Sequence, residues 1–404
     1  MLLSNMRTRF NIFLFLFLFL FLSCKSKTDK NNSDLPITKL SGIDTIRIDL
    51  DTVPANLSFI DLFSYVEPIP LQTTEISSMD NCQKMIINEE NINKYVILDA
   101  RKIELFSFDS IGNFIQKSPL NIKESPYSIL HLNWFFDSGN SFIYNSLDSL
   151  YMYYSGDKFF MYDNKTLKCI RKEKINLDSL YLSAFIPLSN DIYVFQGISN
   201  RMQEEWGDNI CFYSKSEDSI IKKQIILQKI EEIHTFNSPL SSFDNRYFFQ
   251  SNIVSDTIYE IHLDSLSVTP FLIVDYGNKA INEDNKYNFY VEKDRCFGGV
   301  FKSKRFAYLL NMLQNNQSYW FFSRFNGNIY ISVCNKSTKK IQTVPAYNFL
   351  SIIPLLTDEV LYCLIGAGQV QEVIDSGILT EENANRLAKV KPDDNPVILK
   401  CYLK

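Results

Sequence analysis

The sequence predicts an all-β protein, and its composition and its turn chemistry are the observations that predict it. The chain of 404 residues contains 32 Phe and 22 Tyr. Together with frequent β-branched residues, these are the types that strands favour. Gly and Pro number only 13 each, so turns must be made mainly by Asn, Asp and Ser. Short aromatic runs and polar turns alternate along the body of the chain.

Five segments share one pattern, in which an aromatic-bearing strand is followed by a polar turn and a second strand. In KIELFSFDSIGNFIQKS (102–118) the turn is DSIGN, and similar hairpins are predicted over residues 158–175, 209–227, 256–277 and 327–344. Each hairpin is preceded by a further pair of strands, so each unit holds four strands. Such units, with turns about 45 to 70 residues apart, fit the blades of a β-propeller.

The two ends of the chain together supply a sixth blade. Residues 348–366 provide two strands, and PVILKCYLK (396–404) provides a third. The fourth is predicted from YVEPIPLQTT (65–74), because Pro68 and Pro70 cannot donate to a ladder and therefore suit an edge strand. The predicted fold is thus a six-bladed β-propeller with four-stranded antiparallel blades, in which an N-terminal strand closes the last blade.

Few other elements are predicted. DTIRIDLD (44–51) alternates apolar and polar residues, which predicts a short amphipathic strand ahead of the first blade. A short capped turn is predicted at residues 58–66, and residues 305–314 fit either a short helix or part of a strand. The clearest helix is LTEENANRLAKV (379–390), with Thr380 as its N-cap, and it is an insertion in the sixth blade.

The amino end of the chain predicts an export signal. Arg7 and Arg9 precede an uncharged, mainly apolar run over residues 10–22, which is short for a membrane-spanning helix of roughly 20 apolar residues. A basic start, a short apolar region and a small residue before Cys24 are typical of a secretory signal. The polar residues 25–40 predict a flexible tether.

The end of the signal, LFLSC, resembles the lipobox of bacterial lipoproteins, although Phe21 stands where that pattern usually has Leu. The resemblance implies that Cys24 receives a diacylglyceryl group, that the chain is cut before it and that the new amino group is acylated. Several acyl chains hold a protein firmly on a bilayer, at ~0.8 kcal/mol per buried CH2. We therefore expect a signal peptide over 1–23, a lipidated tether over 24–42 and the propeller over 43–404. The alternative is an uncleaved signal anchor.

Charge and cysteine usage narrow the classes of partner. The chain has 41 Lys and Arg against 46 Asp and Glu, a net charge of −5, and losing Arg7 and Arg9 with the signal makes it more negative. This charge balance lacks the excess of basic residues that is typical of a nucleic-acid-binding protein. Seven of the eight cysteines lie beyond Cys24 without a CxxC motif, and most are expected to be small strand hydrophobes. An odd count leaves at least one unpaired in a monomer, and whether any pair forms stays open.

The chain from about residue 43 to its end resembles the six-bladed β-propeller lipoproteins of Bacteroidetes. VEPIPLQTT (66–74), ELFSFDSIGNFI (104–115), SDTIYEIHLDSLSVTPFLIVDYG (255–277) and KPDDNPVILKCYLK (391–404) carry the resemblance. It implies a fold and an export route rather than a reaction, and members are associated with glycan utilisation. One departure is NIKESPYSILHLNWFF (121–136), which lacks the Gly-Pro-Gly-rich loop of many members, so a ligand there would be bound differently.

Motifs for catalysis and metal binding are missing from the sequence. The histidines, His131, His234 and His262, form no HExxH and have no partner at metal-ligand spacing, so neither a metal nor a cofactor is predicted. His131 and His262 are expected to be structural, whereas His234 is a candidate ligand contact. No GxSxG elbow or phosphate loop occurs, and the paired glycines of CFGGVF (296–301) more simply predict a bulge.

A polar insertion, NRMQEEWGDN (200–209), is the main candidate for ligand binding. Trp206 could stack on a sugar face while Arg201 and the acidic side chains take its hydroxyl groups; the two acids are Glu204 and Glu205. The alternative is a solvated loop whose indole packs on the blade. The adjacent charges of Asp99 with Arg101, and of Asp294 with Arg295, are more often surface ion pairs than sites.

Two functions remain open on the sequence. The first is a membrane-anchored, non-catalytic binding or scaffold module, monomeric, for a glycan or a partner protein of the cell envelope. The second is a glycan-active hydrolase or lyase with carboxylates in the central funnel, where strand ends converge without any motif. The missing motifs favour the first. The protein is expected on the outer membrane, and the lack of acids directly after Cys24 favours the periplasmic side over the cell surface.

Overall fold

The computed structural model divides the chain into two units, residues 1–42 and residues 43–404. The described residues all belong to the second unit, and the predicted signal, tether and lipidation site at Cys24 lie outside them. They are residues 43–54, 57–88, 91, 94–99, 101–102, 104–120, 142–155, 157–176, 181–198, 207–228, 240–250, 256–281, 285, 305–347 and 354–404.

The first three blades follow one another along the chain as antiparallel sheets of four strands. Blade 1 holds β3 (Cys82–Ile87), β4 (Tyr95–Asp99), β5 (Glu104–Phe108) and β6 (Phe114–Pro119). Blade 2 holds β7 (Phe142–Asn145), β8 (Leu150–Ser155), β9 (Lys158–Asp163) and β10 (Cys169–Lys174). Blade 3 holds β11 (Tyr181–Pro187), β12 (Ile192–Ile198), β13 (Gly207–Ser214) and β14 (Ser219–Gln228).

Of the last three blades, blades 4 and 6 each include one strand from the N-terminal side of the chain. Blade 4 holds β15 (Leu240–Phe243), β16 (Arg246–Gln250), β17 (Thr257–His262), β18 (Ser267–Asp275) and β1 (Asp44–Arg47). Blade 5 holds β19 (Ala307–Gln314), β20 (Ser318–Phe325), β21 (Asn328–Asn335) and β22 (Ile341–Ala346). Blade 6 holds β23 (Leu355–Leu356), β24 (Val360–Ile365), β25 (Val397–Leu403) and β2 (Phe63–Pro70).

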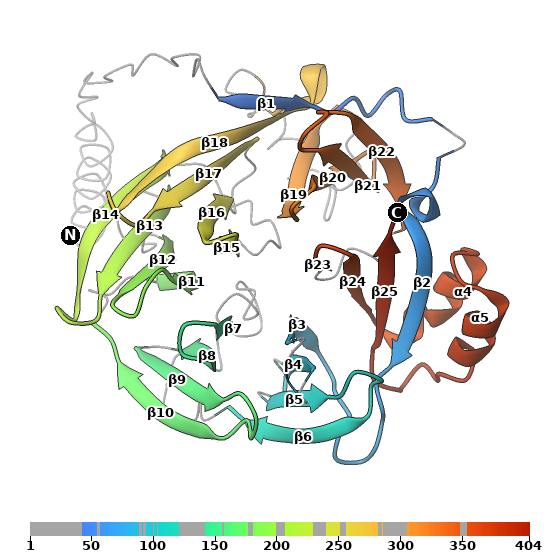
Figure 1. Ribbon diagram of the computed structural model, residues 1–404, viewed down its shortest axis with the longest axis horizontal. Helices are drawn as coiled ribbons and strands as arrows, with labels where there is room; N and C mark the ends of the chain where they lie inside the picture. Colours follow the sequence, from blue (N-terminus) through green and yellow to red (C-terminus); the bar gives the residue numbers. More distant parts are fainter. Residues whose placement is uncertain are drawn as a thin grey trace, which may run out of the picture. The chain divides into compact units, whose positions relative to one another are not determined.

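The six blades of residues 43–404 stand in a ring, with the first strand of each nearest the centre and an outer strand on the rim (Figure 1). Six clusters of buried apolar side chains, counted over the described residues, each join two neighbouring blades. Middle strands are therefore covered on both faces, and every residue of β4 and β24 is buried. Strands covered on both faces are continuous apolar runs rather than alternating ones.

The ring is closed by the pairing of β2 with β25, which lies at the other end of the chain. The two strands are antiparallel, with Phe63 opposite Leu403 and Pro70 opposite Val397. Because β2 is the outer strand of blade 6, its outer edge pairs with no further strand of that sheet. Pro68 and Pro70, which lack a backbone N–H donor, are therefore tolerated in it. The predicted fold class, with its six blades and its N-terminal closing strand, is confirmed.

The helical predictions also hold at their caps. The 3-10 helix η1 (Phe59–Leu62) begins after Ser58, whose N–H donates to the carboxylate of Asp61 at 2.6 Å. In α5 (Glu381–Leu387) the hydroxyl of Thr380 accepts from the N–H of Asn383. Residues 305–314 contain β19, so of the two alternatives the strand is correct.

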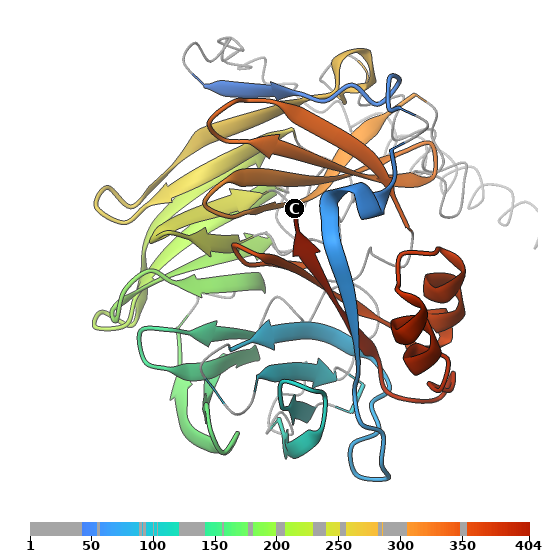
Figure 2. The same ribbon diagram turned by 45° about the vertical axis from the view of Figure 1, so that its right-hand side comes forward.

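A second helix, α4 (Val370–Asp375), was not predicted, because its six residues are too few to show a helical period clearly. Both α4 and α5 lie beside β2 on the outer side of blade 6 (Figure 2). The side chain of Asn383 in α5 donates to the carbonyl of Val66 at 3.0 Å and to the hydroxyl of Tyr65 at 2.8 Å. Among the described residues, no helix is long and apolar enough to cross a membrane.

Among the described residues, hydrogen bonds also link the outer strands of five blades, or the residues directly after them, to the outer turn or strand of the next blade. The amide of Gln224 on β14 bonds both backbone groups of Val268 on β18. Equivalent contacts join Gln72 to Gly112 and Phe114, Gln116 to Lys165, Asn176 to Asp218, and Asp44 to Lys339. The blades are therefore held together by polar contacts on the rim as well as by apolar packing between sheets.

Candidate functional site

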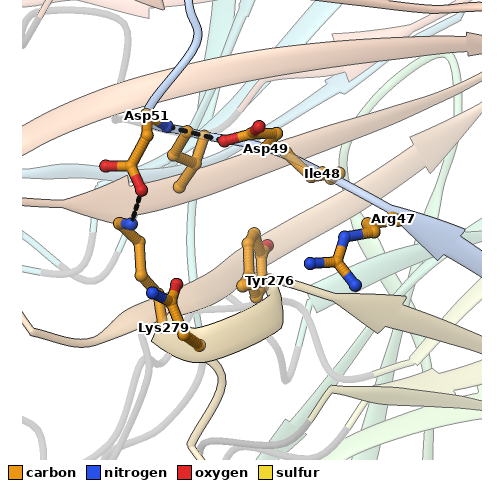
Figure 3. A pocket seen from close by; sticks show the side chains of 8 residues that line it. Arg47, Ile48, Asp49, Asp51, Tyr276 and Lys279 are labelled. Carbon is orange, nitrogen blue, oxygen red and sulfur yellow. Dashed lines mark hydrogen bonds and ion pairs between the residues drawn. The ribbon is translucent and has the colours of Figure 1, made fainter.

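A cavity of about 310 Å³ opens on the rim of blade 4, beyond the end of β1 (Figure 3). One wall is the chain that follows β1, and the other is the turn after β18, which contains the 3-10 helix η3 (Gly277–Lys279). The lining residues are Arg47, Ile48, Asp49, Leu50, Asp51, Tyr276, Asn278 and Lys279.

The first wall is built by the parallel pairing of β1 with β18. Asp44 lies opposite Leu272 and Arg47 opposite Asp275, and the N–H of Ile48 then donates to the carbonyl of Asp275 at 2.8 Å. The apolar residues of this segment, Ile46, Ile48 and Leu50, are buried against blades 4 and 5. Because side chains alternate along an extended chain, the charged residues between them point away from that core.

Arg47 is an exposed charge of the cavity. Its guanidinium lies 3.3 Å from the carboxylate of Asp275, and 71% of its side chain is exposed. A pair as exposed as this contributes ~0–1 kcal/mol, so the guanidinium can exchange Asp275 for a ligand at little cost. Gly277 makes room for it: its φ is +61°, and a Cβ there would lie 2.6 Å from Nη2 of Arg47.

On the opposite side of the cavity the charged residues contact one another (Figure 3). Lys279 is only 10% exposed, forms an ion pair with Asp51 and lies 5.1 Å from the ring centre of Phe325. The N–H of Asp51 donates to the carboxylate of Asp49 at 2.9 Å, and this bond, with others from Thr52, lowers the pKa of Asp49. Asp49 therefore remains an acceptor at neutral and mildly acidic pH.

The cavity thus presents cations, carboxylates and an amide around a small space. Ligand pockets in proteins usually hold roughly 300 to 1,000 Å³ and are lined mainly by apolar groups. This cavity is at the lower end of that size, and charged and amide side chains dominate its lining. Such walls suit a small ligand that is rich in hydroxyl or charged groups. In the part of the chain that the structure describes, no cluster of three His, Cys, Asp or Glu could hold a metal ion.

The ligand contacts predicted from the sequence lie outside the described residues. They are Trp206, Arg201, Glu204, Glu205 and His234. The cavity itself was not predicted. The alternation of DTIRIDLD indicates that charges lie on one face, but three of the eight lining residues come from the distant segment 276–279.

Asp99 has a structural role, although not the surface ion pair that was expected. Its side chain is buried, and its carboxylate accepts from the N–H groups of Asp80, Arg101 and Lys102 at 2.5 to 3.0 Å. It therefore caps the turn between β4 and β5. His262 on β17 contacts the hydroxyl of Thr269 at 2.8 Å, which agrees with a structural residue. Outside the described residues lie His131, Asp294, Arg295, the loop 121–136 and the segment 296–301.

Six of the seven cysteines beyond Cys24 are described, and each is a free thiol. Four of them are buried in strands, as expected of small hydrophobes: Cys211, Cys334, Cys363 and Cys401. The last two are in contact, and burial together with the neighbouring thiol of Cys363 raises the pKa of Cys401. The Cys401 thiol therefore lacks the low pKa of a reactive cysteine. Cys296 lies outside the described residues.

Comparison with known proteins agrees with this architecture. A protein from Bacteroides fragilis NCTC 9343 that is named for its expected export superimposes with a TM-score of 0.63 at 14% identity, over 90% of this chain and 99% of that one. A DUF4221 protein from Bacteroides vulgatus gives 0.45 at 9% identity, over 84% and 97%. No curated protein matches the sequence. The DUF5128 family, described as a 6-bladed beta-propeller, matches residues 39–353, and the chain therefore belongs to that family.

Proposed function

We propose that this protein is an exported, membrane-tethered binding module that recognises a glycan or a partner protein of the cell envelope without catalysing a reaction. The observation that supports binding is the polar cavity beside β1, in which an exposed guanidinium faces an ion pair across a small space. The cavity lies on the rim of a ring that is closed by β2 and packed between neighbouring blades, so its walls need little reorganisation when a ligand enters.

The chemistry of the lining favours a ligand with many hydroxyl groups. Arg47 and Asn278 can donate hydrogen bonds, while Asp49 is held as an acceptor. Hydrogen bonds to charged groups contribute about 1.5–3 kcal/mol each, so a few of them give a useful affinity for a sugar. A peptide segment rich in polar side chains would use the same groups, and a partner protein is therefore the second form of the proposal.

The cellular placement rests on the amino end of the chain. We infer that the signal over residues 1–23 is removed, that Cys24 is lipidated and that residues 24–42 tether the propeller to the outer membrane. The structural similarity to a Bacteroides protein named for its expected export supports the export step. The residues directly after Cys24 are basic rather than acidic, which favours the periplasmic side over the cell surface.

The test is a glycan-array screen of the mature chain with Cys24→Ser, followed by mass spectrometry of any bound glycan. We expect a glycan to bind and to remain intact, and Arg47→Ala to weaken its binding at least tenfold. The control is Arg171→Ala, because Arg171 is likewise a solvent-accessible arginine paired with a carboxylate, that of Glu173 at 3.1 Å, but lies on blade 2.

Cleaved glycan products would contradict the binding module and favour the alternative, a hydrolase or lyase with its site in the central funnel. If no glycan binds, affinity capture from envelope extracts with wild type and Arg47→Ala decides between the remaining outcomes. A protein captured by wild type and lost with the variant supports the partner form of the proposal. Capture that is equal for both variants, or no capture, would overturn the cavity as the binding site.

A further inference from the structure

Aromatic rings from blades 4 and 5 meet beside the start of β1. Phe248 on β16 and Phe271 on β18 lie 5.0 Å apart between ring centres, and Tyr319 on β20 follows Phe271 at 6.2 Å. Phe248 is buried, whereas Phe271 and Tyr319 are only partly covered. The junction of the two blades therefore carries an aromatic surface that remains partly open to solvent.

Two cations lie on these rings. The guanidinium of Arg246 is 4.9 Å from the ring centre of Phe271, and it binds the carboxylate of Glu260 through two bonds of 2.7 Å. The ammonium of Lys336 is 4.5 Å from the ring of Phe243 and 4.7 Å from that of Tyr319. We call Arg246, Phe271, Tyr319 and Lys336 the cation–aromatic patch.

Lys336 differs from its neighbours in the way its charge is balanced. Its ammonium donates to neutral oxygens only, the carbonyl of Asn315 at 2.6 Å and the side chain of Gln314 at 3.1 Å. Arg246 and Lys339 each have a carboxylate partner. Across the described ranges of the chain, no carboxylate lies within ion-pair distance of Lys336.

The environment of Lys336 is also unfavourable to its charge. Burial, and after it the positive charge of Arg246, lower the pKa of Lys336. A half-buried ammonium without a counter-ion, next to a second cation, is stabilised when an anion arrives. An anionic group bound there would gain a charge-assisted hydrogen bond in a partly desolvated position, where such bonds are strong.

From this arrangement we infer that the cation–aromatic patch binds an acidic oligosaccharide, with the carboxylate or sulfate of one sugar on Lys336 and a sugar face on Tyr319 and Phe271. The inference rests on the proposed function only in taking a glycan as the ligand. Flat aromatic faces beside cations match a molecule that carries both C–H faces and acid groups, as an acidic sugar does.

The patch and the cavity lie at opposite ends of β1. Asp44 at the start of this strand pairs with Leu272, the residue after Phe271 of the patch, and Arg47 at its end lines the cavity. Asp44 and Arg47 are separated by three steps of ~3.3 Å along the strand, about 10 Å in all. An oligosaccharide of a few units is long enough to contact the patch and to enter the cavity, where Arg47 would take a second acid group.

The experiment compares trigalacturonic acid with a neutral galactose trisaccharide, titrated into the mature chain with Cys24→Ser. We expect the acidic sugar to bind and the neutral one to bind at least tenfold more weakly. Lys336→Gln, which keeps an N–H donor but loses the charge, should weaken the acidic sugar about tenfold, and added salt should do the same. Lys336→Arg should retain most of the affinity.

The control variant is Lys117→Gln, because Lys117 also lies over an aromatic ring, that of Phe106 at 5.7 Å, and pairs with Glu104. It is on blade 1, and its replacement should leave the affinity unchanged. Tyr319→Leu tests the stacking face separately and should weaken the sugar without changing the salt dependence. Thermal unfolding of each variant shows that the comparison is made between folded proteins.

Equal binding of the two trisaccharides, or an unchanged affinity in Lys336→Gln, would overturn this inference. If a glycan binds with a dependence on Arg47 but not on Lys336, the inference fails while the proposed function stands. Binding to vesicles containing phosphatidylglycerol, with no binding of trigalacturonic acid, would overturn it in favour of a membrane surface. If no glycan of any kind binds, both proposals fail together in their glycan form.

Discussion

The side-chain amide of Gln224 pairs with the backbone of Val268 on the neighbouring blade. Its Oε1 accepts from the N–H of Val268 at 2.9 Å, and its Nε2 donates to the carbonyl of the same residue at 2.8 Å. The amide thus occupies the place of a residue in a further strand and satisfies both backbone groups at the edge of β18. This is one of the contacts by which an outer strand holds the next blade of the ring.

We expect Gln224→Ala to destabilise the protein by about 2 kcal/mol. The variant loses two hydrogen bonds and leaves the backbone of the buried residue Val268 unsatisfied, and such groups cost roughly 1–3 kcal/mol. Urea unfolding at equilibrium measures the change. Gln371→Ala is the control, since Gln371 bonds only Asp375 on the exposed side of α4, and its loss should cost little. Equal effects of the two variants would contradict the role of Gln224.

Gly277→Ala should lower stability by roughly 1–2 kcal/mol, because an L-residue pays that amount for a left-handed conformation. The added Cβ would also displace the guanidinium of Arg47, so binding in the cavity should weaken in parallel. Gly368→Ala is a matched control, since no atom lies within 4 Å of a Cβ there. Thermal unfolding and ligand titration check both expectations, and a Gly277 variant as stable as the Gly368 variant would refute them.

The affinity for an acidic sugar should fall as the pH rises. The fall should begin at a lower pH than it would if Lys336 had the pKa of an ordinary lysine. Only the protonated form of Lys336 attracts an anion, and burial and Arg246 lower its pKa. The other charges that act on it are Asp244 and Asp358, and Tyr319, whose pKa burial raises, lies beneath it. Titrations between about pH 7 and 10.5 test this. The Lys336→Arg variant should show a flat profile over the range, and an equally flat wild type would contradict the assignment.

Asp256→Asn should stabilise the protein at neutral pH. Burial raises the pKa of Asp256, so the folded protein binds this proton more tightly than the unfolded chain. Stability is therefore lost as pH rises from the ordinary pKa of 3.8 through the raised value. The advantage of the variant should be present at pH 7 and should shrink as the pH falls towards 3.8. Urea unfolding at a series of pH values measures it.

Replacing Asp163 by Asn should change the stability at neutral pH in the opposite direction. Hydrogen bonds from the side chain and the backbone of Thr166 lower the pKa of Asp163, so its contribution is present above the ordinary pKa and is lost as pH falls through the lowered value. Asp163→Asn should therefore destabilise the protein at pH 7, and the difference from wild type should diminish in acid. Two variants with the same sign at neutral pH would show that burial and hydrogen bonding do not set these pKa values.

Cys24→Ser should release the protein from the membrane fraction. The wild-type protein should begin at Cys24, incorporate labelled palmitate and sediment with the outer membrane, since acyl chains are the expected anchor. Cell fractionation and intact mass measurement follow both proteins. A variant that still sediments with the membrane, with residues 1–23 intact, would instead favour the uncleaved signal anchor.

Most of the blade architecture could be predicted because it depends on local chemistry. The polar turns between aromatic runs, such as DSIGN at residues 109–113, end one strand and begin the next wherever they occur. Pro68 and Pro70 exclude β2 from the interior of a sheet. The three strands predicted at the C-terminal end needed a fourth strand to complete the sixth blade. The cap of α5 at Thr380 follows from the same kind of local rule.

The placement of β1 and the candidate sites could not be predicted in this way. Alternation in residues 44–51 indicates which face is buried, but not that the strand joins β18 in parallel, 228 residues away from Asp44. An edge strand pairs through backbone groups that every residue carries, so no side-chain pattern specifies its partner. The cavity between Arg47 and Lys279, and the approach of Lys336 to Arg246, exist only because the closed ring brings distant segments together.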